Sequence, residues 1–239
     1  MSQLKSFYTD GHDTIRSAND NGINTTFHDA FWGPSYWSNY DPSSNSSSTP
    51  AADLTLDTHQ YYAFAPLANL THEQILDSVC SISQLLKRPR SSSGIPPTLV
   101  GEWSLETGKA PDASSSSQNN GLADDQARRT WFRLLFEAQN AAYTPNGPGQ
   151  SSIGWTYWTW KTEWDIDTWS YRGGVSQGYI PSDVSNASTY AFPVLDNGCV
   201  DATYNYTAPL HASSAARLIS PATPLLMLVI VVGILHILA

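Results

Sequence analysis

Three residues of the chain could together bind a sugar ring and attack it. Glu102 follows an apolar run in the string VGEWS, where a carboxylate is costly to bury unless neighbouring groups hold it. His59 and Tyr61 lie two residues apart in LDTHQYY, so on a strand they face the same side. A carboxylate can act as a nucleophile, and the imidazole and phenol can orient it. We interpret these residues as a candidate carbohydrate site.

Further polar and aromatic residues stand near the expected strand ends. Trp158 and Trp160 alternate in IGWTYWTW, directly before Lys161, and His28 and Asp29 end the first expected strand. In a parallel barrel the carboxyl ends of the strands converge on one mouth. Indole rings stack on the C–H faces of a sugar while polar groups bond its hydroxyls. We therefore expect all five of these residues to contact substrate.

Simpler interpretations of the same residues stay open. Glu102 could be a solvated or capping residue, His59 a structural histidine, and the tryptophans could fill a core. No metal is expected, because the six histidines show neither a short helical pair nor cysteine partners. No cofactor is expected either, since no phosphate-binding glycine motif occurs. Ser104 lacks the pattern of a serine nucleophile.

Helical and strand-like patterns alternate along the chain, which predicts an α/β fold with parallel strands joined by right-handed crossovers. Thr71 and Gln74 form a capping box at the start of the second helix. Ile75, Val79, Ile82 and Leu86 continue it as an apolar stripe. The expected elements are a helix over 4–19, strands over 23–31 and 54–64, a helix from 71, a strand over 98–103, a helix over 124–142 and a strand over 153–160. In the first helix, whose period is imperfect, Leu4, Phe7 and Ile15 are expected to face inward.

Composition narrows the class of protein. The net charge is −9, from 12 basic and 21 acidic residues, which disfavours a nucleic-acid partner because phosphate binding needs a basic surface. Nine Trp and 12 Tyr provide a large aromatic content. Two cysteines are too few for a disulfide scaffold. The core must therefore come from packed apolar faces.

The C-terminal segment is apolar. Residues 225–239 contain His236 as their single polar side chain, and as a helix they would span about 22 Å, short of the roughly 30 Å hydrocarbon core. Small residues at 213–215 and a short spacer precede them. This layout is typical of a lipid-anchor (GPI) attachment signal. A single-pass membrane helix starting near Leu218 is the alternative.

Glycosylation motifs suggest a secretory route and a cell-surface location. The N-terminus carries no signal peptide, so we expect the chain to be the C-terminal part of a longer product. The five Asn-x-Ser/Thr motifs are at Asn24, Asn45, Asn69, Asn186 and Asn205.

The strings FHDAF, LDTHQYY, LVGEWS and GWTYWTWKTE, in this order, resemble the fungal exo-β-1,3-glucanases of glycoside hydrolase family five. The resemblance covers roughly residues 1 to 200. It implies hydrolysis of cell-wall β-glucan with retention of configuration. It also implies that residues 1–205 form the C-terminal half, strands five to eight, of a (β/α)8 TIM barrel truncated at its N-terminus. A spacer over 206–224 and the apolar tail over 225–239 would follow.

The resemblance also implies roles for single residues. Glu102 matches the family's nucleophile, and Tyr61 would hold it in place. His59 would bond the sugar or the acid, and Trp158 matches the aromatic platform of the eighth strand. The two cysteines match a family pair, which implies a disulfide between Cys80 and Cys199; two unpaired thiols are the alternative.

One departure from the family bears on activity. The family's acid/base glutamate follows an asparagine, and none of the five glutamates here does so, although Glu106 and Glu163 are conceivable substitutes. Retaining hydrolysis uses two carboxyl groups about 5 Å apart. We therefore expect this chain to be weakly active or inactive, and to associate through the open strand edges of a half barrel.

Two other functions stay open. One is a non-catalytic β-glucan-binding remnant that kept the aromatic platform, and the other is a transglycosylase of the same family. Neither linkage preference nor exo against endo action is settled by these motifs.

Overall fold

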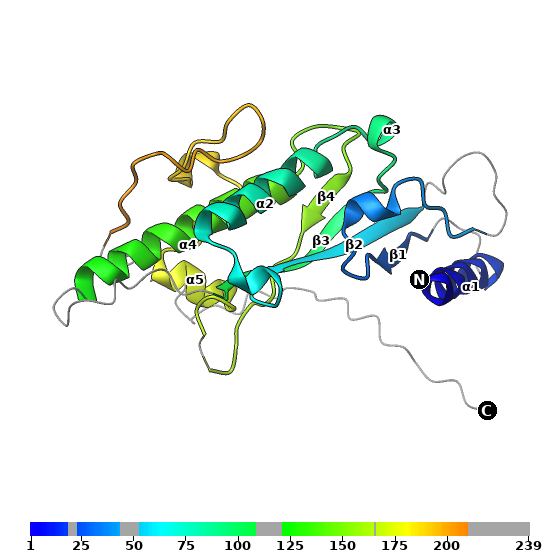
Figure 1. Ribbon diagram of the computed structural model, residues 1–239, viewed down its shortest axis with the longest axis horizontal. Coiled ribbons are helices and arrows are strands. Elements are labelled where there is room, and N and C mark those ends of the chain that lie inside the picture. Colours follow the sequence, from blue (N-terminus) through cyan, green and yellow to red (C-terminus); the bar gives the residue numbers. More distant parts are fainter. Residues whose placement is uncertain (19–22, 44–52, 109–120, 165, 210–239) are drawn as a thin grey trace, which may run out of the picture.

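A computed structural model describes residues 1–18, 23–43, 53–108, 121–164 and 166–209 (Figure 1). Helices and strands alternate along most of this part of the chain. The helices are α1 (Ser2–Ala18), α2 (His72–Leu86), α3 (Arg90–Ser93), α4 (Gly121–Tyr143) and α5 (Tyr171–Gln177). The strands are β1 (Thr25–His28), β2 (Leu54–Tyr62), β3 (Thr98–Thr107) and β4 (Ser152–Trp155). Short 3-10 turns cover Pro34–Trp37, Leu67–Asn69 and Ala187–Thr189.

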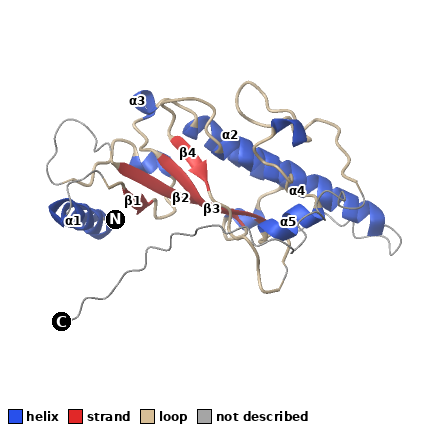
Figure 2. Ribbon diagram, turned by 180° about the vertical axis from the view of Figure 1, so that it is seen from behind, coloured by secondary structure: helices blue, strands red, loops and turns tan. Residues whose placement is uncertain are grey.

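The four strands form one sheet in the order β1-β2-β3-β4, and every neighbouring pair is parallel. The predicted α/β fold with parallel strands is thus confirmed. α2 and α4 lie side by side near β3, whereas α1 lies at the other end of the sheet beside β1 (Figure 2). β1 and β4 are the outer strands of this sheet. Self-association through these edges stays a prediction.

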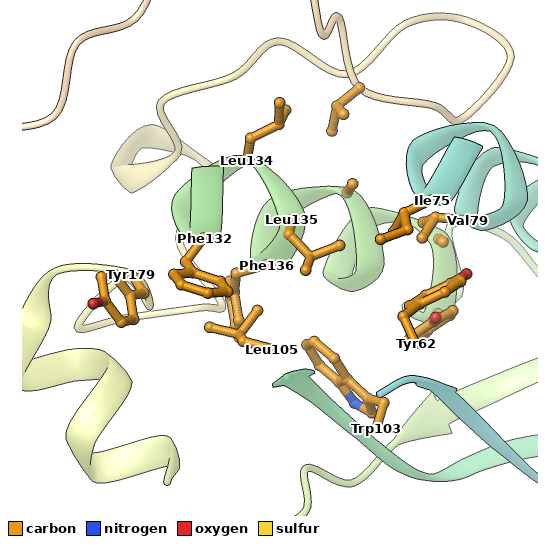
Figure 3. Packing of buried hydrophobic residues seen from close by; sticks show 14 of the residues in the cluster. Tyr62, Ile75, Val79, Trp103, Leu105, Phe132, Leu134, Leu135, Phe136 and Tyr179 are labelled. Carbon is orange, nitrogen blue, oxygen red and sulfur yellow. The ribbon is translucent and has the colours of Figure 1, made fainter. Parts of the chain in front are cut away.

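The main core lies between α2, α4 and the sheet (Figure 3). Thr71 begins α2 with the predicted capping box, in which its side chain accepts from the Gln74 backbone N–H. The apolar stripe of this helix is buried at Ile75, Val79 and Leu86. Trp103 of β3 packs against the aromatic rings of α4 and of the segment after it. This packing fixes β3, the strand that carries Glu102.

α1 differs from expectation in which residues it buries. Phe7 and Ile15 were expected to face inward, but Phe7 is 68% exposed and Ile15 is also exposed. Leu4 and Tyr8 pack instead against a small cluster around Phe27. The Tyr8 ring contacts the rings of Phe27 and Trp37 in this cluster. These contacts, rather than the imperfect apolar period of the helix, determine which side of α1 is buried.

The last strand is shorter than the sequence pattern predicts. β4 ends at Trp155 rather than at Trp160. Beyond it, the Thr159 backbone N–H bonds the Trp169 carbonyl, and the Tyr171 N–H bonds the Thr159 carbonyl. The chain after Trp158 therefore pairs with its own later segment instead of extending the sheet. Conversely, β3 runs to Thr107, past the predicted end at Trp103.

A disulfide joins Cys80 of α2 to Cys199, as the family resemblance implied. No helix in the described part of the chain is both long and apolar enough to cross a membrane. The apolar tail over 225–239, most of the spacer before it and Asn45 lie outside the described residues. Asn24, Asn69, Asn186 and Asn205 are exposed, and their glycosylation stays a prediction, as do the boundaries at 205 and 224.

Candidate active site

The site is built on one face of β2. Asp57, His59 and Tyr61 are spaced two residues apart on this strand, so their side chains point to the same side of the sheet. His59 lies beside β3, where its register partner is Glu102. On the other side, the His28 ring of β1 lies edge-on to the His59 ring, with 4.4 Å between the ring centroids.

A β-bulge turns Glu102 toward this face. Thr58 pairs with Val100, but the next residue, His59, pairs with Glu102, so Gly101 is the extra residue in β3. Without the bulge, Glu102 would lie opposite Gln60 and point to the other face. Bulges re-aim side chains in this way and are over-represented next to active sites. The single inserted glycine therefore decides which face carries the carboxylate.

Glu102 is held through one of its two oxygens. The Tyr61 hydroxyl donates to Oε2 at 2.8 Å, and Nδ1 of His59 lies 3.2 Å from the same oxygen. Oε1 has no hydrogen-bond partner among the described residues. The side chain is 29% exposed, so water or a ligand can reach it. One oxygen is thus fixed and the other is available.

Tyr61 stays a hydrogen-bond donor over a wide pH range. Burial is the main reason that its pKa is raised, and the hydrogen bond to Glu102 and the negative charge of that carboxylate raise it further. All three effects disfavour a phenolate at this position. The hydroxyl proton therefore remains on Tyr61 and points to Oε2.

These residues open into a pocket of about 820 Å³. Its size is in the range of small-molecule sites, which combine an apolar lining with a few placed polar groups. Trp158 lines it and is 50% exposed. The polar groups are His59, Gln60, Tyr61, Glu102 and Asp29, and the aromatic rings are Phe31, Trp32, Phe64, Trp158 and Trp169.

The structure brings together some predicted site residues and separates others. Glu102, His59, Tyr61, Trp158 and Asp29 all line the pocket. Asp29 is only 1% exposed. The Thr58 hydroxyl donates to one of its oxygens at 2.5 Å, and the Phe31 backbone N–H donates to the other. Asp29 therefore orders the loop after β1, and its carboxylate is already engaged.

Three other predicted residues lie beside or outside the pocket. His28 is not part of its lining, and its Nδ1 accepts from the Ala30 backbone N–H at 3.0 Å. Trp160 and Lys161 are exposed and are absent from the lining as well. Trp160 instead stacks on Tyr171, with 5.9 Å between ring centroids. Trp158 still bonds β3 through its backbone N–H, whereas the chain from Thr159 onward bonds its own later segment.

The carboxylates lining the described pocket are Asp29 and Glu102. Glu106 accepts a hydrogen bond from the Thr168 hydroxyl, and neither it nor the exposed Glu163 is part of the lining. In the part of the chain that the structure describes, no cluster of three or more His, Cys, Asp or Glu side chains is suited to a metal ion. Glu102 is therefore the one accessible carboxylate of the described lining.

Sequence reasoning did not select four of the aromatic residues that form the pocket walls. Phe31, Trp32, Phe64 and Trp169 come from loops after β1, β2 and β4. Loops have no regular spacing of side chains, so the sequence pattern does not show which loop residues point toward a site. Asp57 was also missed as a neighbour of His59. Its spacing on β2, two residues before His59, was the signal that could have identified it.

Curated fungal proteins resemble this chain over much of its length. It is 32% identical over 150 residues to the probable glucan endo-1,6-beta-glucosidase B of Neosartorya fischeri, covering 63% of this chain and 32% of that protein. It is 27% identical over 215 residues to the glucan 1,3-beta-glucosidase of Blumeria graminis, covering 78% of this chain and 46% of that protein. The chain thus spans less than half the length of these relatives. No protein-family model matches it.

Among solved structures, the rutinosidase from Aspergillus niger aligns with 17% identity and a TM-score of 0.45, over 70% of this chain and 39% of that one. The sequence matches to fungal glucan glucosidases agree with the four motifs read from the sequence. The chain is therefore similar to fungal glucan beta-glucosidases, which supports its resemblance to the fungal glucanases of glycoside hydrolase family five.

Proposed function

We propose that this chain carries the nucleophile half of a retaining β-glucan hydrolase, with Glu102 as the nucleophile. The observation that carries the proposal is the asymmetry of the Glu102 carboxylate. Tyr61 and His59 both contact Oε2, whereas Oε1 has no hydrogen-bond partner among the described residues, and Glu102 lines a pocket with aromatic walls. A nucleophile needs this arrangement, because one oxygen must be oriented while the other forms the new bond.

The proposed step is a displacement at the anomeric carbon. Oε1 of Glu102 forms a bond to that carbon while the bond to the leaving oxygen breaks, and the bonding electrons depart with the leaving group. Trp158 stacks on a sugar face and holds the ring over the carboxylate. Water then forms a bond to the anomeric carbon while the bond to Oε1 breaks, its electron pair returns to Glu102, and the water proton passes to solvent. Transfer to another sugar instead of water would make the same site a transglycosylase.

The rate of this displacement depends on whether the leaving group must be protonated as it departs. Asp29 is the second carboxylate in the described pocket lining, and its oxygens are engaged by Thr58 and Phe31. A general acid contributes about 100- to 10,000-fold when a poor leaving group must be protonated. We infer that β-glucan is cleaved slowly, whereas glucosides that release an acidic phenol react without this help.

The substrate class follows from the relatives and from the pocket. One of the relatives is named for glucan 1,6 bonds and the other for 1,3 bonds, so we propose β-glucan with either linkage and 1,3 as the first choice. The parallel sheet with two outer strands is compatible with strands five to eight of a (β/α)8 barrel. Attachment to the cell surface through the apolar tail is part of the same proposal.

The second candidate is a β-glucan-binding protein with no catalytic activity. It is favoured by the hydrogen bonds that occupy both carboxylate oxygens of Asp29, which leave that residue unsuited to act as a general acid. Kinetics with a series of aryl β-glucosides separates the two. The hydrolase proposal expects turnover that rises steeply as the phenol becomes more acidic and that disappears in Glu102→Gln. Binding of laminarin with no turnover of any aryl glucoside would favour the binding protein. Turnover retained in Glu102→Gln would remove Glu102 from the nucleophile role.

A further inference from the structure

We propose that Asp57 is a positioning residue that sets the orientation of the Glu102 carboxylate through His59; the inference rests on the proposed role of Glu102. Asp57 Oδ2 lies 3.2 Å from Nε2 of His59, and Nδ1 of the same ring lies 3.2 Å from Glu102 Oε2. The imidazole is therefore held between two carboxylates, one on its own strand and one on β3.

Both ring nitrogens face a carboxylate oxygen, which fixes the plane of the ring. An imidazole with one contact can rotate about its Cβ–Cγ bond, since that torsion has a broad minimum. A second contact on the opposite nitrogen removes this freedom. A histidine oriented by an outer partner is a recurring device in metal sites and serine proteases. Here the oriented group on the far side is the proposed nucleophile.

Asp57 acts without touching the substrate space. It is absent from the described pocket lining, and its Oδ1 is buried with no hydrogen-bond partner among the described residues. A buried carboxylate oxygen without a partner costs free energy. The cost indicates that Asp57 is kept for its contact with His59 rather than for the stability of the sheet.

Gly101 provides the space that Asp57 occupies. A Cβ atom at this position would collide with Oδ1 and Cγ of Asp57. Gly101 is also the extra residue of the bulge that turns Glu102 toward His59. Gly101 therefore affects both carboxylates that contact His59: the bulge turns Glu102 toward the ring, and the missing side chain leaves room for Asp57. A side chain there is expected to displace Asp57 even though the aspartate itself is retained.

A double-mutant cycle isolates this relationship. The variants are Asp57→Ala, Gly101→Ala and the double variant, with Asp57→Asn as the conservative change and Asp196→Ala as the control. Asp196 is exposed in a loop outside the pocket lining. The probe is a 2-fluorinated β-glucoside with a 2,4-dinitrophenolate leaving group. This reagent traps a glycosyl-enzyme and needs no proton for departure of the phenolate.

The expected readouts separate positioning from folding. Asp57→Ala lowers the maximal trapping rate about 10- to 100-fold, the range typical of outer partners of histidine ligands. The reagent concentration for half-maximal rate stays within about threefold, because Asp57 does not line the pocket. Asp57→Asn keeps an acceptor oxygen and restores most of the rate. Gly101→Ala slows trapping in the presence of Asp57 and adds little in its absence, so the two losses are not additive.

A second measurement tests the contact without any substrate. The nitrogen NMR signals of the His59 ring are expected to move in Asp57→Ala and to stay in place in Asp196→Ala. Unchanged His59 signals, or an unchanged maximal trapping rate in Asp57→Ala, would overturn the inference. If the unmodified chain is not trapped while the His59 signals do respond, the proposed function has failed and Asp57 has only a structural contact. The two failures are therefore distinguishable.

Discussion

The Tyr61 hydroxyl donates to Oε2 of Glu102 at 2.8 Å across a sequence separation of 41 residues. The two residues lie on neighbouring parallel strands, β2 and β3. The same oxygen also lies within reach of His59 Nδ1. The phenol and the imidazole therefore restrain one carboxylate oxygen together, and Glu102 itself lines the pocket.

Replacing Tyr61 by phenylalanine tests this restraint. A hydrogen bond to a charged group contributes about 1.5–3 kcal/mol, which corresponds to roughly 10- to 100-fold in rate. We expect Tyr61→Phe to lower the turnover of an activated aryl glucoside by that factor. Tyr204→Phe is the matched control, since Tyr204 is exposed on a loop outside the pocket lining. Equal rates in both variants would show that the Tyr61 hydroxyl has no part in the reaction.

Several buried tyrosines should resist ionisation at alkaline pH. Burial raises the pKa of Tyr62 and of Tyr179 from 10.0 to about 12, and it raises that of Tyr61 as well. A raised pKa means that the folded protein keeps protons that the unfolded chain loses. Their contribution to stability is therefore complete below pH 10 and is lost as the pH rises through 12.

Absorbance of phenolate measures this effect. We expect the folded chain to show fewer than 12 phenolates per molecule at pH 11, and urea to release the remainder. The free energy of unfolding should fall over the same pH interval. A single titration near pH 10 that accounts for all tyrosines in the folded protein would contradict the raised pKa values of these three tyrosines.

The aromatic platform predicts a difference between two exposed tryptophans. Trp158 lines the pocket, whereas Trp164 is 83% exposed and does not. Stacking on a sugar buries apolar ring surface, so we expect Trp158→Ala to weaken binding of β-1,3-gluco-oligosaccharides about tenfold, or roughly 1.4 kcal/mol. Trp164→Ala should leave the affinity unchanged. Calorimetric titration of both variants is the measurement, and equal affinities would remove Trp158 from the binding site.

The disulfide should stabilise the fold without affecting the chemistry. Cys80 and Cys199 are separated by 119 residues, and closing a loop of that length restricts the unfolded chain. Replacing both cysteines by alanine is expected to lower the free energy of unfolding by about 2–5 kcal/mol. Urea denaturation measures the change. The aryl glucosidase rate at a temperature where the variant stays folded should remain the same, because neither cysteine lines the active-site pocket.

Regular periodicity made the centre of the site predictable. His59 and Tyr61 lie two residues apart on a strand, and the structure places both on the Glu102 side of the sheet. The position of Glu102 itself depends on the bulge at Gly101, which an alternation pattern does not contain. A glycine inside a strand does signal a bulge or a close backbone approach, and Gly101 provides both.

Loop residues could not be predicted in the same way. Trp160 lies apart from Trp158 in a stretch where the chain leaves β3 after Trp158, with the Thr159 N–H bonding the Trp169 carbonyl and the Tyr171 N–H bonding the Thr159 carbonyl. These bonds join segments ten or more residues apart along an irregular stretch. Phe31 and Trp32 reach the pocket because the chain turns after β1, where Ala30 and Phe31 adopt positive φ angles of 55° and 61°. Residue types alone identify neither the irregular stretch after Trp158 nor the turn after β1.

The most direct test of the account is to locate the bond that the proposed nucleophile forms. The full chain is incubated with the 2-fluorinated dinitrophenyl β-glucoside, digested with a protease and analysed by mass spectrometry. The account predicts one added fluoroglucosyl group, on the peptide that contains Glu102, and none on the Glu102→Gln variant. A label on any other residue, or an unlabelled chain that still releases dinitrophenolate in repeated turnovers, would contradict it.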